Sequence, residues 1–227
     1  MALDHIKKLI NPESALSVYD KIFTARIGND IFFTSRIPKI GIVCPPPPLS
    51  FEQQWKQHYR KAFQTVVENS SEDSFYFSLT SRIMAAYKPK PGFEKEFGKV
   101  VSVRTTFTPS YIPPYAEEVT PIINDWLYPL NIEWDVRAPE LTGMDYAVYS
   151  LNGIWGLWFS ADDFLIIGGP EKFVDTFFQM IGSTIEEMVF RSVAGVRYEE
   201  NAWNYLIKLF SEEQILVYKK LYKSKKE

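Results

Sequence analysis

Hydrophobic and polar positions follow their clearest pattern between residues 145 and 168. Two runs rich in aromatic and aliphatic residues flank Asn152-Gly153, the dipeptide most typical of a β-hairpin because both residues accept a positive φ. A second reversal is expected at 161–163, so this segment predicts a three-stranded antiparallel meander. Its two inner runs are apolar on both faces, which indicates that other elements cover both faces of the sheet.

Helical periodicity is the main pattern in the N-terminal third of the chain. Residues 3–10 predict a short helical turn. A proline directly after Asn11 then predicts the start of a helix. The backbone N–H of the first helical residue has no intrahelical hydrogen-bond partner, so proline, which lacks this group, fits there without loss. Gly28 is expected to end this helix.

The C-terminal third predicts four more helices, the first of which opens at Pro170. Ser183 with Glu186, and Ser211 with Gln214, have the spacing of capping boxes, in which two side chains satisfy helix N–H groups reciprocally. The expected apolar stripe of the last helix consists of Ile215, Tyr218, Leu221 and Tyr222. The third of these four helices is expected over 198–210. The remaining predicted elements are helices over 50–68 and 115–128, and strands at 31–37, in the first half of 75–87, at 99–108 and at 132–137.

These elements predict an α+β fold. An antiparallel sheet that includes the meander at 145–168 is expected at its centre, covered by helices from the N-terminal and C-terminal parts of the chain. The length of 227 residues fits one large domain, so we expect a single domain over 1–227. The proline-containing breaker at 88–92 offers the alternative, which is a subdivision near 88–98.

Composition and charge limit the cellular compartment and the classes of partner that we expect for this protein. The net charge is −3, and the one dense basic run, at 219–226, reads as a solvated end of the chain, so we expect no nucleic-acid partner. The single cysteine, Cys44, permits no internal disulfide. The sequence has no run of about 18 apolar residues and no signal-peptide pattern, so we expect a cytoplasmic protein without a membrane partner.

Few residues suit metal binding or nucleophilic catalysis. With two histidines and one cysteine the chain cannot assemble a Cys₄ or Cys₂His₂ zinc site. A Gly-x-Ser-x-Gly nucleophile motif is also missing, so we assign no metal, no cofactor and no catalytic residue. His58 lies beside the apolar stripe of a predicted helix, where it is either a general base or a partly packed boundary residue.

Glu133, Asp135 and Arg137 alternate with apolar residues and so share one face of a predicted strand. Carboxylates two residues apart on a strand have stems about 6.6 Å apart, which matches the roughly 6.5–9.5 Å between the carboxyl groups of inverting glycosidases. A solvated strand face produces the same pattern, and Arg137 would keep Asp135 ionised, which is wrong for a general acid. The three residues are candidates for a binding site or for an ordinary solvated face.

Aromatic residues are abundant, with 17 Phe, 13 Tyr and 6 Trp, and such residues build both cores and protein interfaces. Trp155 and Trp158 are expected on opposite faces of the meander. Our leading hypothesis is a non-catalytic intracellular protein that acts by protein–protein contact or self-association. The second is a small-molecule binder with an aromatic-lined pocket walled by Trp155 or Trp158. The third is an enzyme with Asp135 or Glu133 as base, assisted by His58.

Overall fold

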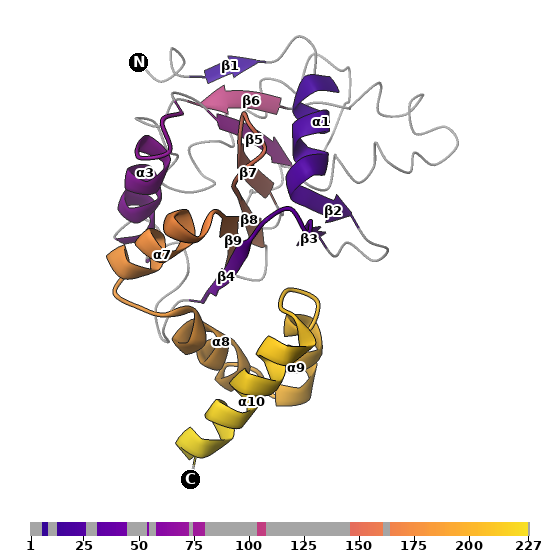
Figure 1. Cartoon of the computed structure of the whole chain (residues 1–227), viewed down its shortest axis with the longest axis vertical. Helices are drawn as coiled ribbons and strands as arrows, with labels where there is room; N and C mark the ends of the chain where they lie inside the picture. Colours follow the sequence, from indigo (N-terminus) through magenta and orange to yellow (C-terminus); the bar gives the residue numbers. More distant parts are fainter. Residues whose placement is uncertain are drawn as a thin grey trace, which may run out of the picture.

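The computed structural model describes most of the predicted helices and strands. The described residues are 6–8, 13–25, 31–44, 54, 58–72, 75–79, 104–107, 146–160 and 164–226. Within them the prediction of a mixed fold with an antiparallel sheet is confirmed (Figure 1). The predicted helix at 115–128 and the predicted strand at 132–137 lie outside the described residues.

One large sheet dominates the described part of the chain (Figure 1). Its strands are β1 (Ile6–Lys8), β4 (Lys39–Val43), β5 (Phe75–Leu79), β6 (Arg104–Phe107), β7 (Tyr146–Ser150), β8 (Gly156–Ser160) and β9 (Phe164–Gly169). They lie in the order β1-β6-β5-β7-β8-β9-β4, and every neighbouring pair is antiparallel. A separate antiparallel pair joins β2 (Phe23–Ala25) to β3 (Ile31–Phe33).

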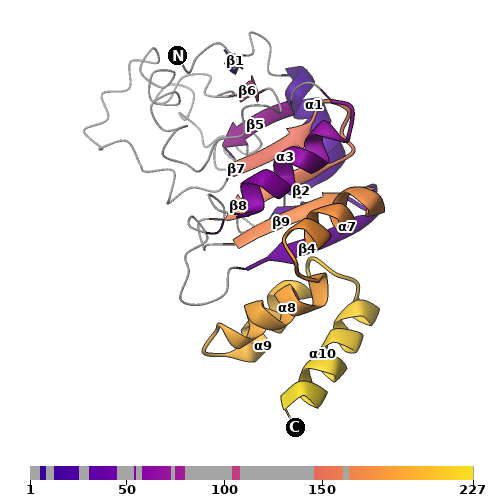
Figure 2. The ribbon, with the colours of Figure 1, turned by 90° about the vertical axis from the view of Figure 1, so that its left-hand side faces the viewer.

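Helices and the small β2–β3 pair are layered on this sheet. The helices are α1 (Glu13–Ile22), α3 (Arg60–Glu68), α7 (Glu171–Met180), α8 (Ile185–Ala194), α9 (Glu199–Leu206) and α10 (Glu212–Lys226). Figure 2 shows α3 and α7 in front of one face of the sheet, and Figure 1 shows α1 with the β2–β3 pair on the opposite side. The last three helices lie beyond β4, an edge strand, and α8 packs against it.

Aromatic packing joins the sheet to α3 and α7. Trp155, the residue before β8, is fully buried, and its indole stacks on the ring of Phe173 with centroids 5.3 Å apart. Phe63 of α3 meets the same indole edge-on at 5.7 Å. These rings fill the space between sheet and helices, so the helices are held by large apolar contacts rather than by polar groups.

Two glycines let the β2–β3 pair approach the other face closely. A Cβ atom on Gly156 would lie 2.6 Å from the ring of Phe23, and one on Gly168 would lie 2.5 Å from the ring of Phe33. Real Cβ atoms do not come this close to other carbons, so any larger residue would push the β2–β3 pair outward. Glycine at these two strand positions therefore marks a close approach of two layers.

The connection between β7 and β8 is longer than the two-residue turn predicted from Asn152-Gly153. It covers 151–155, and within it only Gly153 has a positive φ, of +74°. The hydroxyl of Ser150 accepts hydrogen bonds from two backbone N–H groups of this loop. The carboxylate of Glu72 accepts two more from Asn152. Polar side chains therefore add to the backbone hydrogen bonds of the loop, in which the Ser150 N–H donates to the Trp155 carbonyl and the Gly153 N–H to the Ser150 carbonyl.

Local prediction was wrong in two places at the N-terminal end. Residues 6–8 form strand β1 instead of a helical turn, because β6 offers them an antiparallel partner that a local pattern does not reveal. The first helix ends at Ile22 rather than near Gly28, since the chain continues directly into β2.

One of the two capping boxes predicted in the C-terminal third is confirmed. Ser211 and Gln214 exchange hydrogen bonds at the start of α10. The other box is shifted by one residue from the predicted Ser183–Glu186 pair, because Thr184 is the N-cap residue of α8 and pairs with Glu187.

Candidate functional site

The two tryptophans predicted as site residues lie in the core. Trp155 has no exposed surface, and Trp158 exposes 4% of its surface. The Trp158 ring meets Phe164 edge-on at 5.9 Å, on the sheet face opposite to that of Trp155. Both indole N–H groups are buried without a hydrogen-bond partner among the described residues. Packing therefore accounts for both side chains in the part of the chain that is described.

Of the predicted polar site residues, His58 alone lies within the described ranges. His58 is exposed just before α3. Glu133, Asp135 and Arg137 lie outside the described residues, so the carboxylate-based enzyme stays a prediction.

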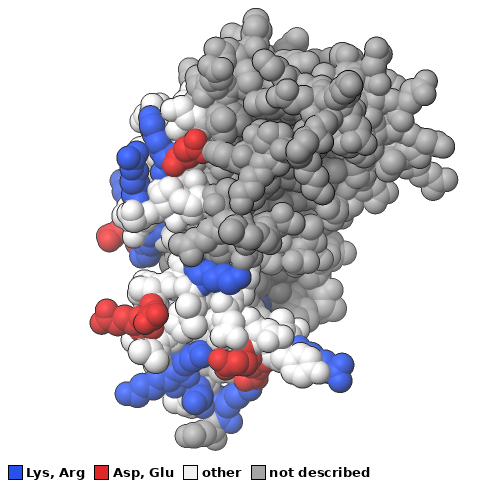
Figure 3. Space-filling model, turned by 90° about the vertical axis from the view of Figure 1, so that its right-hand side faces the viewer, with Lys and Arg blue, Asp and Glu red and all other residues white. Residues whose placement is uncertain are grey.

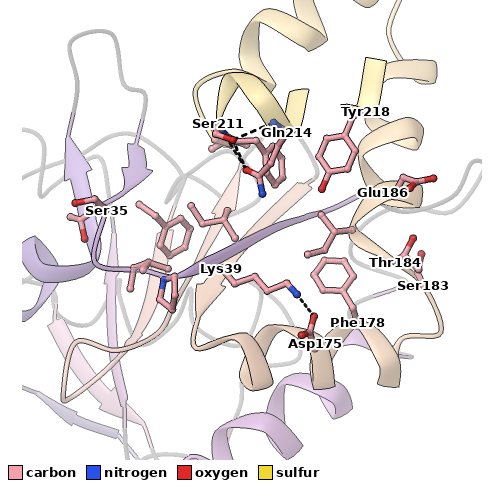
Figure 4. Close-up of a pocket in the computed structure, with 18 of the residues that line it drawn as sticks. Ser35, Lys39, Asp175, Phe178, Ser183, Thr184, Glu186, Ser211, Gln214 and Tyr218 are labelled. Carbon is pink, nitrogen blue, oxygen red and sulfur yellow. Dashed lines mark hydrogen bonds and ion pairs between the residues drawn. The ribbon is translucent and has the colours of Figure 1, made fainter. Parts of the chain in front are cut away.

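A cleft of about 1070 Å³ opens between the sheet and the C-terminal helices (Figure 4). We call it the Lys39 cleft. It is lined by the segment 33–40, the second half of α7, the start of α8, and the α9–α10 junction with the adjoining part of α10. Ligand sites in proteins usually measure about 300–1,000 Å³, so the cleft is large enough for a small molecule. Neither Trp155 nor Trp158 lines it.

Polar groups stand on two walls of the Lys39 cleft (Figure 4). On one wall the Nζ atom of Lys39 lies 2.6 Å from Oδ1 of Asp175. On the other, burial raises the pKa of the Tyr218 hydroxyl, and the nearby Glu186 carboxylate raises it further. A phenol with a raised pKa stays protonated at neutral pH. Tyr218 can therefore donate a hydrogen bond to a ligand, but it is not a base.

Helices α8 and α10 begin at the Lys39 cleft. The side chains that cap them already form hydrogen bonds within their own helices. The Thr184 hydroxyl accepts a hydrogen bond from the Glu187 backbone, and the Glu187 carboxylate accepts one from the Thr184 backbone. Ser211 and Gln214 do the same at α10. Among the remaining polar groups of the lining, the Lys39–Asp175 pair and the Tyr218 hydroxyl can orient a ligand.

Cys44 follows β4 and is not activated. Burial raises the pKa of its thiol to about 12, although the Arg191 guanidinium acts in the opposite direction. Arg191 also donates a hydrogen bond of 3.3 Å to the backbone carbonyl of Cys44. A protonated thiol is a poor nucleophile and a poor metal ligand. No group of three or more His, Cys, Asp or Glu residues in the described part of the chain is placed to hold a metal ion.

The C-terminal helix α10 has one packed side and one open side. Ile215 and Tyr222 are buried against the other C-terminal helices. On the opposite side Leu216, Val217 and Leu221 expose 68%, 52% and 37% of their surfaces. Val217 and Leu221 lie one turn apart and are neighbours on the helix, whereas Leu216 is connected to Val217 through Lys220, which lies one turn from both. The basic run at 219–226, expected to be a solvated chain end, lies within this helix.

Charged residues complete this open side. Lys220 adjoins Leu216 and Val217, and its aliphatic stem extends the apolar area. Glu213 lies one turn before the same two residues. We define the α10 surface as Glu213, Leu216, Val217, Lys220 and Leu221.

Three other lysines of α10 form ion pairs with the neighbouring helices α8 and α9. Lys219 pairs with Glu200 at 3.5 Å, Lys225 pairs with Glu186 at 3.2 Å, and Lys226 pairs with Glu199. Figure 3 shows acidic and basic side chains close together over the end of the molecule that these helices form. Glu213 and Lys220 form no ion pair with any residue in the described ranges.

Sequence reasoning missed both of these places. The Lys39 cleft combines residues from four separate segments, which no local pattern connects. The α10 surface had a signal, because Leu216 and Val217 lie outside the predicted apolar stripe of that helix. Among the described helices, none has both the length and the apolar character needed to cross a bilayer. Comparisons of the chain with protein-family models, with curated proteins and with solved structures found no match.

Proposed function

We propose that the protein acts by non-covalent contact with another polypeptide through the α10 surface. The observation that carries this proposal is the exposure of three large aliphatic side chains on one side of a helix whose other side is packed. Contiguous apolar groups rimmed by polar residues mark interaction sites. Glu213 and Lys220 supply the polar residues, since they lie one turn before and one turn after Leu216 and Val217 along the helix.

The three aliphatic side chains are not needed to hold α10 in place, because buried Ile215 and Tyr222 and the lysine ion pairs already do so. Fully burying a Leu or Val side chain gains about 1.5–3 kcal/mol. Association costs about 4–15 kcal/mol before any gain appears. Three partly exposed side chains therefore support a weak, reversible contact rather than a permanent one.

In this proposal the meander at 145–168 is the scaffold of the contact surface rather than the surface itself. Its covering helices are α3 and α7 on one face, and α1 with the β2–β3 pair covers the other. β9 carries the edge strand β4, and α8 packs against β4. The C-terminal helices thus take their position from the sheet, and α10 takes its position from α8 and α9.

Site-specific photo-crosslinking tests the proposal. A photoreactive amino acid replaces Leu216 in the full chain, and the matched control carries it at Lys172, an exposed residue of α7. We expect position 216, and not position 172, to give one defined adduct, identified by mass spectrometry. Its partner should no longer bind the purified Leu216→Asp variant. Adducts of equal yield at both positions, or none at position 216, would refute the proposal.

Binding of a small molecule in the Lys39 cleft is a second candidate function. The supporting observation is the cleft volume of about 1070 Å³, with a lining of apolar side chains and of polar groups that include the Lys39–Asp175 ion pair and the Tyr218 phenol. The ligand this lining suits is amphipathic, with a polar group at Lys39–Asp175 or Tyr218 and an apolar part against Phe33 and Phe178.

Ligand-observed NMR with a fragment library tests this second candidate. Ser35 is exposed and lines the cleft, so Ser35→Trp fills the cleft without disturbing the core. Fragments that bind the wild type and the Lys172→Trp control, but not Ser35→Trp, would support it. Fragments that bind all three proteins equally, or a complete lack of binding, would rule it out.

A further inference from the structure

We infer that the partner of the α10 surface is a second copy of this chain, bound so that the two α10 helices run antiparallel about a two-fold axis between Leu216 and Val217. This inference rests on the proposed function and names its partner. In such a pair Leu216 of one copy packs on Val217 of the other. Because the contact is isologous, each of its interactions occurs twice.

Charge complementarity carries the inference. Glu213 and Lys220 are seven residues apart, so they lie two turns apart on the same side of α10, about 10.5 Å along its axis. They are also placed symmetrically about the midpoint between Leu216 and Val217. Antiparallel pairing about that midpoint brings Glu213 of each copy opposite Lys220 of the other. The α10 surface is therefore complementary to itself in charge as well as in apolar character.

Within one copy these two charges have no counterpart one turn away. The residues three and four positions after Glu213 are Leu216 and Val217, and the same two precede Lys220 by four and three positions. Neither charge forms an ion pair with a residue that the structure describes. Lys219, Lys225 and Lys226, by contrast, each pair with a glutamate of a neighbouring helix.

The position of α10 leaves room for a second copy. Figures 1 and 2 place this helix at the end of the molecule farthest from β1. Its 15 residues span about 22 Å, so a helix pair buries much less than the roughly 800 Å² per partner of a standard interface. We therefore expect a reversible monomer–dimer equilibrium.

Sedimentation equilibrium of the purified full chain, over a wide range of concentrations, tests the inference. The weight-average mass of the wild type should rise with concentration from 26.4 kDa toward twice that value. Glu213→Lys and Lys220→Glu should each weaken dimerisation about tenfold, because both ion pairs become repulsions. An equimolar mixture of these two variants should recover the wild-type affinity. In the mixed dimer the lysine introduced at position 213 faces the glutamate introduced at position 220, and the other pair keeps its native residues.

Lys172→Glu is the matched control, because it makes the same charge change on an exposed residue of α7 and should leave dimerisation unchanged. A wild type that stays at 26.4 kDa at every concentration would overturn the inference. So would a mixture of the two variants that dimerises no better than either alone. If the crosslinker at position 216 then captures a different polypeptide, the proposed function stands and only the inference fails; if it captures none, both fail.

Discussion

The loop and strand around Trp155 and the open side of α10 use apolar residues in opposite ways. Trp155 and Trp158 are large aromatic residues that the sequence analysis predicted as site residues, and they expose 0% and 4% of their surfaces. Leu216 belongs to a common residue type, yet it exposes 68%. A large aromatic ring gains most when many neighbours surround it, and two layers supply those neighbours around β8. Residue type therefore predicts that the two tryptophans are packed in the core. Whether Leu216 belongs to an interaction surface depends instead on whether another part of the chain covers it.

The sharpest test of this comparison is truncation to alanine in both regions. Trp155→Ala removes the ring that Phe63 and Phe173 contact, and should lower the free energy of unfolding by about 3–5 kcal/mol. Leu216→Ala should change it by no more than about 0.5 kcal/mol, because the side chain has few neighbours. Urea unfolding followed by tryptophan fluorescence and by circular dichroism measures both. Comparable losses in the two variants would mean that α10 is covered by part of its own chain.

A second test concerns how tightly the sheet is covered. Gly168→Ala places a Cβ atom 2.5 Å from the ring of Phe33, so the β2–β3 pair must shift, and we expect a loss of about 1–3 kcal/mol. Gly195→Ala, after α8, meets only a backbone oxygen at 3.4 Å and should be close to neutral. Thermal unfolding of the two variants gives the comparison. A neutral Gly168→Ala would show that the β2–β3 pair is loosely attached to the sheet.

How far the sequence predicts this molecule depends on the range of the interactions involved. Interactions within a few residues were predictable, such as the Ser211–Gln214 cap. Strand β1 was mistaken for a helical turn, because its partner β6 lies about a hundred residues away in the sequence and only pairing reveals it. The same reason accounts for the β7–β8 loop, which depends on the distant carboxylate of Glu72.

The two candidate sites also differ in how far apart in the sequence their residues lie. The Lys39 cleft could not be predicted, because its ion pair joins residues 39 and 175 on separate elements. The α10 surface was predictable in principle, because Leu216 and Val217 follow Ile215 directly and so point away from the stripe that Ile215 begins. The sequence predicts that α10 has apolar residues on more than one side; only the packing of Ile215 and Tyr222 identifies the open one.

The smallest expected effect is a pH dependence confined to the helical end of the molecule. Hydrogen bonds from the Ser183 hydroxyl at 2.8 Å and the Thr184 backbone at 3.0 Å lower the pKa of the Glu187 carboxyl. Because the folded pKa lies below the unfolded value of about 4.3, the ionised cap stabilises the fold above that pH. The contribution is lost as the pH falls through the folded pKa. Glu187→Gln should therefore flatten part of the stability profile below about pH 4.3.

Carboxyl ¹³C titration by NMR checks the direction of the shift, and urea unfolding between neutral and acid pH checks its consequence. Glu171→Gln is the matched control, because Glu171 also lies in the first turn of a helix but accepts no hydrogen bond from a described residue. The Glu171 carboxylate interacts with the helix dipole, as the Glu187 carboxylate does, but it takes part in no capping box. If both variants change the acid profile equally, the dipole and not the capping box stabilises α8. If only Glu187→Gln does, the helices that carry α10 depend on an exposed polar cap, whereas the sheet depends on buried rings.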